Sequence, residues 1–591
     1  MARLVTPGYD RSTLIAQTLA PVEERCLEFK GLNRREVVEE GEMSDMLNLC
    51  SDDYPILSPR KPRGELTLPE GVKLPLQIMA KYNRLAMIAR DTDDSISFYF
   101  DGVKIDEVDD LTYDTKMVSI NTKICFYSGS RKTCISVLQR GTSAGIVTGS
   151  YTSLEESVAV TNVSVVTSNE DARIVLSGIK NFNYDDAVDI SGTLAYTAGG
   201  TQLSVECKVS CIIEEVIKDE TNEQTTLVLP RETFIELTGE GATDIALTGA
   251  ISRSWPDLDF VIEWNNRLWG ASSSDNTVYA CKLGDPTNWH YFQSTGLDSF
   301  YAQQGTDGIW TGCATYSSHV IFFKQDSMTR IYGTSPATFQ VANAQCYGVE
   351  EGSDRSTVTI NDRVFYKSAI GIMCYEGGIP YCVSEKFNTS FRNVIGGTEG
   401  SKYYASIQDA KGGFPLLVLD IDKGVWHKED STRMTGTCTI DNRLYFINAQ
   451  SEALKCGPSA ITSQWLLVGH GAASNGKILI INPLNANEST EDIEWMAQFG
   501  PFDEYMENRK IYSKILMRLV RSNESEVKVY ISENEGAWEL VQDFYPTKTG
   551  GDYIPIIPRR CDRYSIKIEG KGKCSVKSLT RKVRRGTGGR L

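Results

Sequence analysis

The sequence predicts an all-β protein, a β-propeller of about seven blades with an inserted β-sandwich-like domain and a C-terminal β-sandwich-like domain. Two observations carry this prediction. A short phrase recurs, in which polar residues precede a basic residue and two or three apolar residues. The segments between its copies alternate apolar and polar side chains and end in turn residues, as short strands do. The basic positions are Arg84, Lys123, Arg267, His319, Arg363, Lys402 and Arg443.

The spacing of this phrase sets the number of blades. Successive gaps are 39, 144, 52, 44, 39 and 41 residues. Five of the six gaps lie near the length of a propeller blade, roughly 40 to 50 residues. The long gap fits one blade plus an insertion of about 100 residues. Seven basic positions therefore predict seven units. Six or eight blades are the alternatives, because ring closure often uses a strand from the other end of the chain.

The parts follow in chain order. Residues 1–74 lack the phrase and contain the proline-rich run Ser58–Gly64, which predicts an N-terminal arm and linker. Residues 75–144 hold the first blades, with a hairpin turn at Asp101-Gly102. Residues 145–250 interrupt the repeat with Thr- and Val-rich strands, the inserted β domain. The remaining blades occupy 251–458, and 459–591 form a C-terminal β domain with a basic tail.

The bulk composition indicates a cytoplasmic site of synthesis. Charged residues, Asp10 and Arg11, follow the N-terminus before any apolar run begins, so no signal peptide is expected. No stretch approaches the roughly 20 apolar residues of a membrane span, so no membrane anchoring is expected. The 15 cysteines are scattered without a Cys-x-x-Cys pair, and there are only four histidines. Metal sites and a disulfide framework are therefore not expected.

Charge divides the chain. The net charge is −16, but residues 559–591 carry twelve basic and two acidic side chains, a net +10, so the rest carries −26. An acidic body argues against tight wrapping by nucleic acid, which needs phosphate neutralisation. The basic end is the best candidate for an interaction, with an acidic neighbouring subunit ahead of DNA phosphates. The candidate residues are Arg581, Lys582, Arg584 and Arg585.

A search for chemistry predicts no enzyme. The sequence has no nucleophile elbow, phosphate loop, dinucleotide fingerprint or metal-binding histidine pair, so neither catalytic residues nor a cofactor are expected. Glycoside hydrolysis is the enzyme alternative, since two carboxylates suffice. The phrase Ser532–Trp538 resembles a sialidase turn but favours a plain hairpin. We interpret Trp255, Trp264 and Trp269 as residues of the blade core rather than as a platform that stacks on sugars. We interpret Arg267 as a structural contact with a neighbouring blade.

Longer phrases resemble a bacteriophage virion family. They include Gly31–Asn33, Glu39–Leu49, Asp52–Pro55, Trp255–Phe260, Asn265–Gly270, Lys282–Trp289, Arg330–Gly333, Pro558–Arg563 and Ile568–Gly572. The family is that of the β-propeller tail proteins of tailed phages, related in architecture to the short-tail nozzle and to the packaged-DNA stabilisation protein. The resemblance covers most of the chain except 145–250 and supplies no catalytic residues.

The resemblance implies a structural virion protein of the tail, assembled in the host bacterial cytoplasm. It implies a homohexameric ring, a tail nozzle or hub, below the portal and adaptor, which retains packaged DNA and conducts it during DNA ejection. Its partners would be other copies of itself, the portal-adaptor, other tail proteins and, transiently, genomic DNA. The alternatives are a carbohydrate-binding or glycan-degrading propeller on the phage tail and a cellular β-propeller scaffold.

Overall fold

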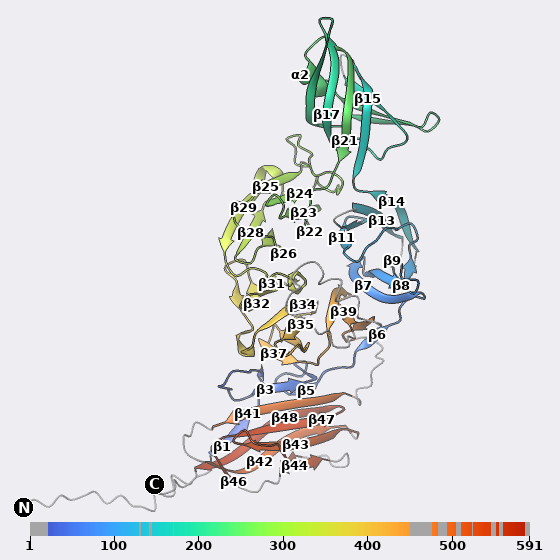
Figure 1. The fold of residues 1–591 in the computed structure, drawn as a ribbon. Coiled ribbons are helices and arrows are strands. Elements are labelled where there is room, and N and C mark those ends of the chain that lie inside the picture. Colours follow the sequence, from blue (N-terminus) through green and yellow to red (C-terminus); the bar gives the residue numbers. More distant parts are fainter. Residues whose placement is uncertain are drawn as a thin grey trace, which may run out of the picture.

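The computed structural model shows three parts in a row, with the insertion and a C-terminal sandwich at opposite edges of a propeller (Figure 1). No helix of the described residues is long and apolar enough to cross a membrane. The structure describes residues 22–128, 132–140, 145–168, 171–449, 476–482, 493–503, 510–522, 524–544, 551–554 and 559–585.

The predicted propeller is confirmed, and its described residues form seven four-stranded antiparallel blades. Blades 1 to 3 are β7 (Val72–Lys81), β8 (Arg84–Asp91), β9 (Ile96–Phe100) and β10 (Val103–Lys104); β11 (Lys116–Ile120), β12 (Lys123–Tyr127), β13 (Lys132–Arg140) and β14 (Gly145–Ser153); β22 (Phe260–Trp264), β23 (Arg267–Ser272), β24 (Thr277–Ala280) and β25 (Phe300–Gln303). Blades 4 to 6 are β26 (Gly312–Tyr316), β27 (His319–Phe323), β28 (Ser327–Tyr332) and β29 (Gln340–Gln345); β30 (Val358–Ile360), β31 (Arg363–Ser368), β32 (Gly371–Tyr375) and β33 (Tyr381–Cys382); β34 (Phe391–Glu399), β35 (Lys402–Asp409), β36 (Leu416–Asp420) and β37 (Val425–Lys428).

Blade 7 closes the ring with a strand from the N-terminal side. It consists of β38 (Met434–Ile440), β39 (Arg443–Ala449), β40 (Gly476–Ile480) and β6 (Gly64–Leu66), with Ile478 of β40 opposite Leu66. The first strand of each blade contacts the first strand of the next in chain order, and β38 contacts β7. The seven first strands therefore surround the axis, and the ring is closed.

The recurring phrase has a structural cause. In all seven blades its basic residue is the first residue of the second strand, from Arg84 in β8 to Arg443 in β39. The preceding polar residues form the two-residue turn from the first strand. Asn265 and Asn266 have φ of 51° and 59°, as a type I′ turn needs, and asparagine tolerates this conformation well.

The C-terminal domain is a sandwich of two sheets. The five-stranded sheet has the order β1 (Val22–Cys26), β48 (Cys574–Arg585), β42 (Lys510–Arg521) and β45 (Gly551–Ile554), with β46 (Arg559–Cys561) also on β42. The six-stranded sheet has the order β2 (Gly31–Leu32), β3 (Glu42–Leu47), β41 (Glu494–Phe502), β47 (Tyr564–Lys571), β43 (Glu526–Glu533) and β44 (Glu539–Phe544). Ser532–Trp538 includes the turn between β43 and β44, as the hairpin interpretation predicted.

The prediction of an arm and linker over 1–74 is wrong for its described part. Strands β1, β2 and β3 complete the sandwich, β4 (Leu49–Cys50) pairs with β5 (Ser58–Pro59), and β6 completes blade 7. These strands are only two to six residues long, so no local periodicity marks them. The partners of β1, β6 and, on one side, β3 also lie hundreds of residues away. Residues 1–21 and the expected domain boundary at 458/459 lie outside the described residues.

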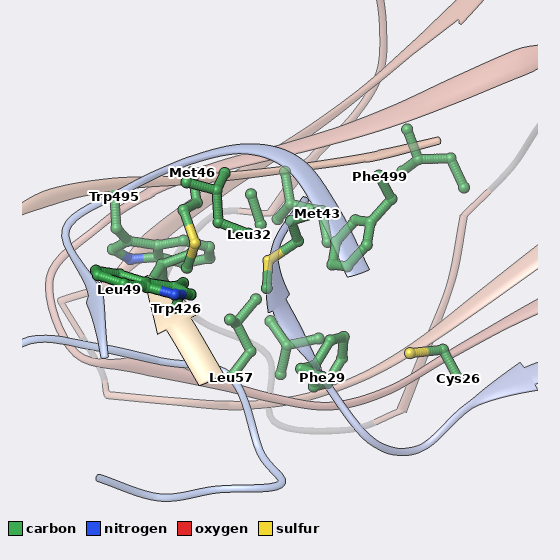
Figure 2. Packing of buried hydrophobic residues seen from close by; sticks show 14 of the residues in the cluster. Cys26, Phe29, Leu32, Met43, Met46, Leu49, Leu57, Trp426, Trp495 and Phe499 are labelled. Carbon is green, nitrogen blue, oxygen red and sulfur yellow. The ribbon is translucent and has the colours of Figure 1, made fainter. Parts of the chain in front are cut away.

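A continuous apolar core joins the sandwich to the propeller (Figure 2). Phe29, from the N-terminal segment, packs against Phe499 of β41, with ring centres 5.7 Å apart. Trp426 of β37, the outer strand of blade 6, belongs to the same cluster and lies beside Leu49 and Trp495. Trp426 is 4% exposed, and its indole Nε1 donates a hydrogen bond of 2.8 Å to the carbonyl of Val383. Because both parts bury side chains in one cluster, the sandwich is fixed to blades 5 and 6.

Ion pairs line the same junction. Burial alone would raise the pKa of Asp45, but Lys428 at 2.6 Å and Arg34 at 3.1 Å hold this pKa below its ordinary value. Burial opposes ionisation of Asp420 too, yet hydrogen bonds from Ser51 and Lys423 keep its pKa low. The carboxylates of the junction are therefore stabilised in their charged form.

We predict that acid destabilises this junction. Each of these carboxyls has a lower pKa in the folded than in the unfolded protein. Such a group stabilises the folded state at pH values above its unfolded pKa, about 4, and this stabilisation is lost as pH falls through its folded pKa. The free energy of unfolding, measured by urea denaturation, should be level from pH 7 to 5 and fall below pH 4. Lys428→Met should make the decrease shallower, and an unchanged pH profile would contradict this account.

The insertion, predicted to be sandwich-like, is a single bent sheet whose two halves face one core. Its described residues form one seven-stranded sheet in the order β18 (Thr201–Ile212), β17 (Ala187–Ala198), β21 (Thr243–Arg253), β15 (Glu156–Thr167), β16 (Asp171–Ser177), β20 (Gln224–Pro230) and β19 (Glu215–Asp219), with helix α2 (Glu232–Thr238). The long strand β15 pairs with β21 and then with β16, and its register shifts between Val160 and Val163. This bulge lets the sheet bend, so that Leu194 and Leu227 from its two halves share one core.

Candidate assembly surface

The four interaction residues predicted from the sequence lie on β48, a central strand of the five-stranded sheet, and not in a flexible tail. Arg584 is exposed, and Lys582 is half-buried with its Nζ 2.7 Å from Glu23. The hydrogen bond from Lys582 lowers the pKa of the Glu23 carboxyl. Arg585 ends β48, and its side chain and residues 586–591 lie outside the described part.

Arg581 must be corrected from a surface contact to an internal one. Its side chain is 2% exposed and donates two hydrogen bonds to Glu40, of 2.9 and 2.7 Å. Its guanidinium lies 3.7 Å from the centre of the Phe502 ring. On β48, Leu579, Arg581 and Val583 all point into the sandwich, so alternation along the strand decides the role of Arg581.

The neighbouring strand β42 adds basic residues that the sequence search missed. Ile515 and Met517 are fully buried in the core, whereas Lys514 and Arg518 are exposed on the opposite face. The signal was present in the spacing of Lys514 and Arg518, which lie four residues apart and therefore on one face of a strand. We define the basic sheet face as Lys514 and Arg518 of β42 with Lys577, Lys582 and Arg584 of β48.

Strand register places like charges side by side on this face. Lys514 is the direct cross-strand neighbour of Lys582. Like charges in directly opposed positions destabilise a sheet, by up to about 1 kcal/mol. Glu23, opposite Lys582 on the edge strand β1, offsets part of this repulsion. A basic face that the fold itself does not favour is typical of a surface selected for binding an anionic partner.

The acidic charge gathers at the other edge of the molecule. Residues 145–253 hold seventeen acidic and six basic side chains, a net charge of −11. The insertion lies across the propeller from the basic sheet face (Figure 1). The molecule is therefore electrostatically polarised along its length. The exposed carboxylates of the insertion include Glu214, Glu215, Glu220, Glu223, Glu232, Glu236, Glu240 and Asp244.

The tryptophans considered as a sugar platform are core residues. Trp255, Trp264 and Trp269 are 4%, 8% and 0% exposed, and Trp269 donates a hydrogen bond to the carbonyl of Trp264. Buried rings cannot stack on a glycan. Arg267 is also buried, and it donates mainly to carbonyls of its own blade, at Cys281, Gly296 and Asp298. Its guanidinium lies 5.9 Å from the ring of Phe339, just before β29 of blade 4, as the structural interpretation expected.

Two histidines are held neutral inside the propeller. Burial lowers the pKa of His319 to about 4, and its Nε2 lies 2.8 Å from the hydroxyl of Tyr375. Burial likewise lowers the pKa of His427 to about 3. Both side chains are 1% exposed, so neither faces a substrate. Across the described ranges, no three His, Cys, Asp or Glu side chains are grouped so that they could hold a metal ion.

Comparisons with known proteins carry no argument about the fold or function of this chain. No protein-family model matches the sequence, and neither does any curated protein. Among solved structures, Kluyveromyces lactis Hsv2 is 11% identical at a TM-score of 0.25, over 60% of this chain and 100% of that one. Phage phi92 endosialidase is 10% identical at a TM-score of 0.26, and the match covers 86% of this chain and 80% of the endosialidase chain. PorZ of Porphyromonas gingivalis is 11% identical at a TM-score of 0.24, and the match covers 88% of this chain and 77% of the PorZ chain.

Proposed function

We propose that this chain is a structural virion protein of a tailed bacteriophage, which assembles as a ring in the tail and acts without catalytic residues, cofactor or metal. The observation that carries the proposal is the polarised architecture. A propeller is fixed through a shared apolar core to a sandwich with a basic sheet face, and an acidic insertion lies at the opposite edge. The resemblance of the propeller and sandwich phrases to phage tail proteins supports the same assignment.

The charge distribution favours contacts between copies. In a ring each subunit offers two different surfaces to its neighbours, so one surface must complement the other. The basic sheet face and an acidic surface of the next copy provide such complementarity, which also favours rapid and correctly oriented association. This contact is preferred to DNA phosphates because a body of charge −26 outside residues 559–591 repels DNA.

The conduit for DNA would lie between copies. Within one chain the first strands of the seven blades contact one another in turn around the propeller axis. A duplex passing through the tail would therefore be surrounded by several propellers. In this arrangement the ring, of six copies by resemblance, retains the packaged genome below the portal and adaptor and conducts it during ejection.

Mass photometry of the purified full-length chain tests this proposal. We expect a discrete species at several times the monomer mass, which dissociates as salt is raised because the contact is electrostatic. A monomer at all protein and salt concentrations, also with portal-adaptor rings present, would contradict the ring and favour a cellular scaffold.

A further inference from the structure

Two of the scattered cysteines meet on neighbouring strands of blade 2. Cys125 of β12 is the direct cross-strand partner of Cys134 of β13. Both are free thiols, and both are buried. In the strand registers of the described residues, no other two cysteines stand directly opposite each other. The fold therefore brings together two thiols that no short sequence motif connects.

The hydrogen-bond pattern of the ladder places these two cysteines at bridging distance. The amide of Val137 donates to the carbonyl of Thr122, so these two residues form a hydrogen-bonded pair. The two kinds of pair alternate along an antiparallel ladder. Three steps further along, the Cys125–Cys134 pair is therefore of the non-hydrogen-bonded kind. Its Cα atoms should be about 4.5 Å apart, within the range of about 4.4 to 6.8 Å that a disulfide spans.

The two thiols differ in acidity. The Cys125 thiol donates a hydrogen bond to Cys134, and this bond lowers the pKa of Cys134 to about 6 although burial opposes the shift. Oγ1 of Thr152 on β14, 3.4 Å from the sulfur of Cys134, acts in the same direction as that bond. The contact with Cys134 and burial both raise the pKa of Cys125. A thiolate beside a thiol is the arrangement of a reactive cysteine and its resolving partner.

The pair lies next to the attachment of the insertion. Cys125 and Cys134 belong to the apolar cluster between blades 2 and 3, which includes Trp255. Strand β14, which pairs with β13, leads into β15 of the insertion, and Trp255 follows β21 where the chain returns. A covalent link between β12 and β13 would therefore fasten the blade from which the insertion leaves the propeller.

We propose that Cys125 and Cys134 are a dithiol that hydrogen peroxide converts to a disulfide. The Cys134 thiolate attacks one oxygen of the peroxide, the O–O bond breaks, and the leaving hydroxide takes up the proton that Cys134 gave up. Cys134 is now a sulfenic acid. The sulfur of Cys125 attacks it, the S–O bond breaks, and the hydroxyl leaves as water with the Cys125 proton. Two thiols are oxidised and one peroxide is reduced to two waters.

The burial of both sulfurs is the reason for naming hydrogen peroxide as the oxidant. A small neutral molecule reaches a buried sulfur more readily than a bulky disulfide reagent does. This inference does not depend on ring formation.

Peptide mapping of the full-length protein tests the dithiol. The folded protein is treated with excess hydrogen peroxide, denatured with N-ethylmaleimide to block remaining thiols, and digested with trypsin without a reducing agent. Trypsin separates the two cysteines into the peptides Ile124–Arg131 and Thr133–Arg140. We expect these peptides to be linked, lighter than their sum by two hydrogen atoms, and we expect dithiothreitol to restore both thiols. Recovery of both cysteines as maleimide adducts or sulfinic acids would overturn the proposal.

The chain supplies a matched control in Cys207 and Cys211. They lie four residues apart on β18, and Lys208 between them places them in separate tryptic peptides. Four residues of strand span about 13 Å, which is beyond the reach of a disulfide. These two cysteines should stay unlinked in the same digest. If they link as readily as Cys125 and Cys134, the oxidation is unspecific and the proposal is wrong.

Single variants separate the two steps. In Cys125→Ala the sulfenic acid of Cys134 has no resolving thiol, so dimedone should trap it, and the adduct should appear on Thr133–Arg140. In Cys134→Ala, Cys125 should remain a thiol and take no dimedone. Labelling of Cys125 rather than Cys134 would contradict Cys134 as the attacking thiol. Unchanged tryptophan fluorescence checks that each variant is folded, and the mapping of the unaltered protein needs no variant.

Discussion

Reversing the charge of the basic sheet face is expected to convert the assembled protein into monomers. Changing Lys514, Arg518, Lys577 and Arg584 together to glutamate replaces attraction to an acidic neighbour by repulsion. All four side chains are exposed, so the fold should remain intact. Double-mutant studies put single close charge pairs across interfaces at roughly 1.5 kcal/mol or more, so four reversals should weaken association by at least about a thousandfold. Mass photometry of the variant gives the fraction of monomer.

A control with the same change in net charge shows whether position matters. Lys73 and Lys104 of blade 1 with Arg392 and Lys411 of blade 6 are exposed and lie on the propeller. Reversing these four should leave oligomers intact. Equal loss of assembly in both variants would show that only total charge acts. Normal rings from the first variant would remove the basic sheet face from the interface.

Removing Arg63 is expected to cause the largest loss of stability by a single substitution. Arg63 precedes the closing strand β6, is 7% exposed, and contacts Glu429 and Asp430 at 2.7 Å each. Although burial alone would raise the pKa of Asp430, Arg63 is the main cause that holds it below its ordinary value. Arg63→Ala leaves buried Glu429 without its cation and Asp430 with only the more distant Arg60, at 3.9 Å, so the free energy of unfolding should fall by about 3 to 5 kcal/mol. Urea denaturation followed by tryptophan fluorescence measures this loss.

Lys61 provides the comparison for Arg63. It lies two residues earlier, and its Nζ is 3.2 Å from Asp52, but its side chain is 63% exposed. Lys61→Ala should lower the free energy of unfolding by less than about 1 kcal/mol, as exposed ion pairs do. Similar losses for both variants would mean that the Arg63 cluster does not fasten the closing strand.

The features predicted from the sequence are local ones. The turn phrase marked the start of the second strand in every blade. In five of the seven blades its turn contains asparagine or aspartate, which suit the left-handed conformation of a tight turn, for example at Asn442 with φ of 61°. Asp101-Gly102 marked the β9–β10 hairpin for the same reason. The conformation of such a turn depends on two adjacent residues, so it can be predicted without knowledge of distant strand partners.

Features that depend on distant pairing were not predicted. Val22–Cys26 becomes a strand only because β48, more than 500 residues away, offers an edge. Arg581 stood within a basic run, and only its inward position on β48 and the carboxylate of Glu40 show that it is internal. Conversely, Lys514 lies far from the basic tail in sequence, and register alone places it beside Lys582.

Electron cryomicroscopy of the purified chain, alone and with portal-adaptor rings, tests the central claim most directly. The account predicts a closed ring with a channel wide enough for duplex DNA. It also predicts that the basic sheet face of each copy, at Lys514, Arg518, Lys577 and Arg584, meets an acidic surface of the next. A ring in which this face lines the channel would indicate contact with DNA instead. Monomers that remain apart from the adaptor would contradict the ring itself.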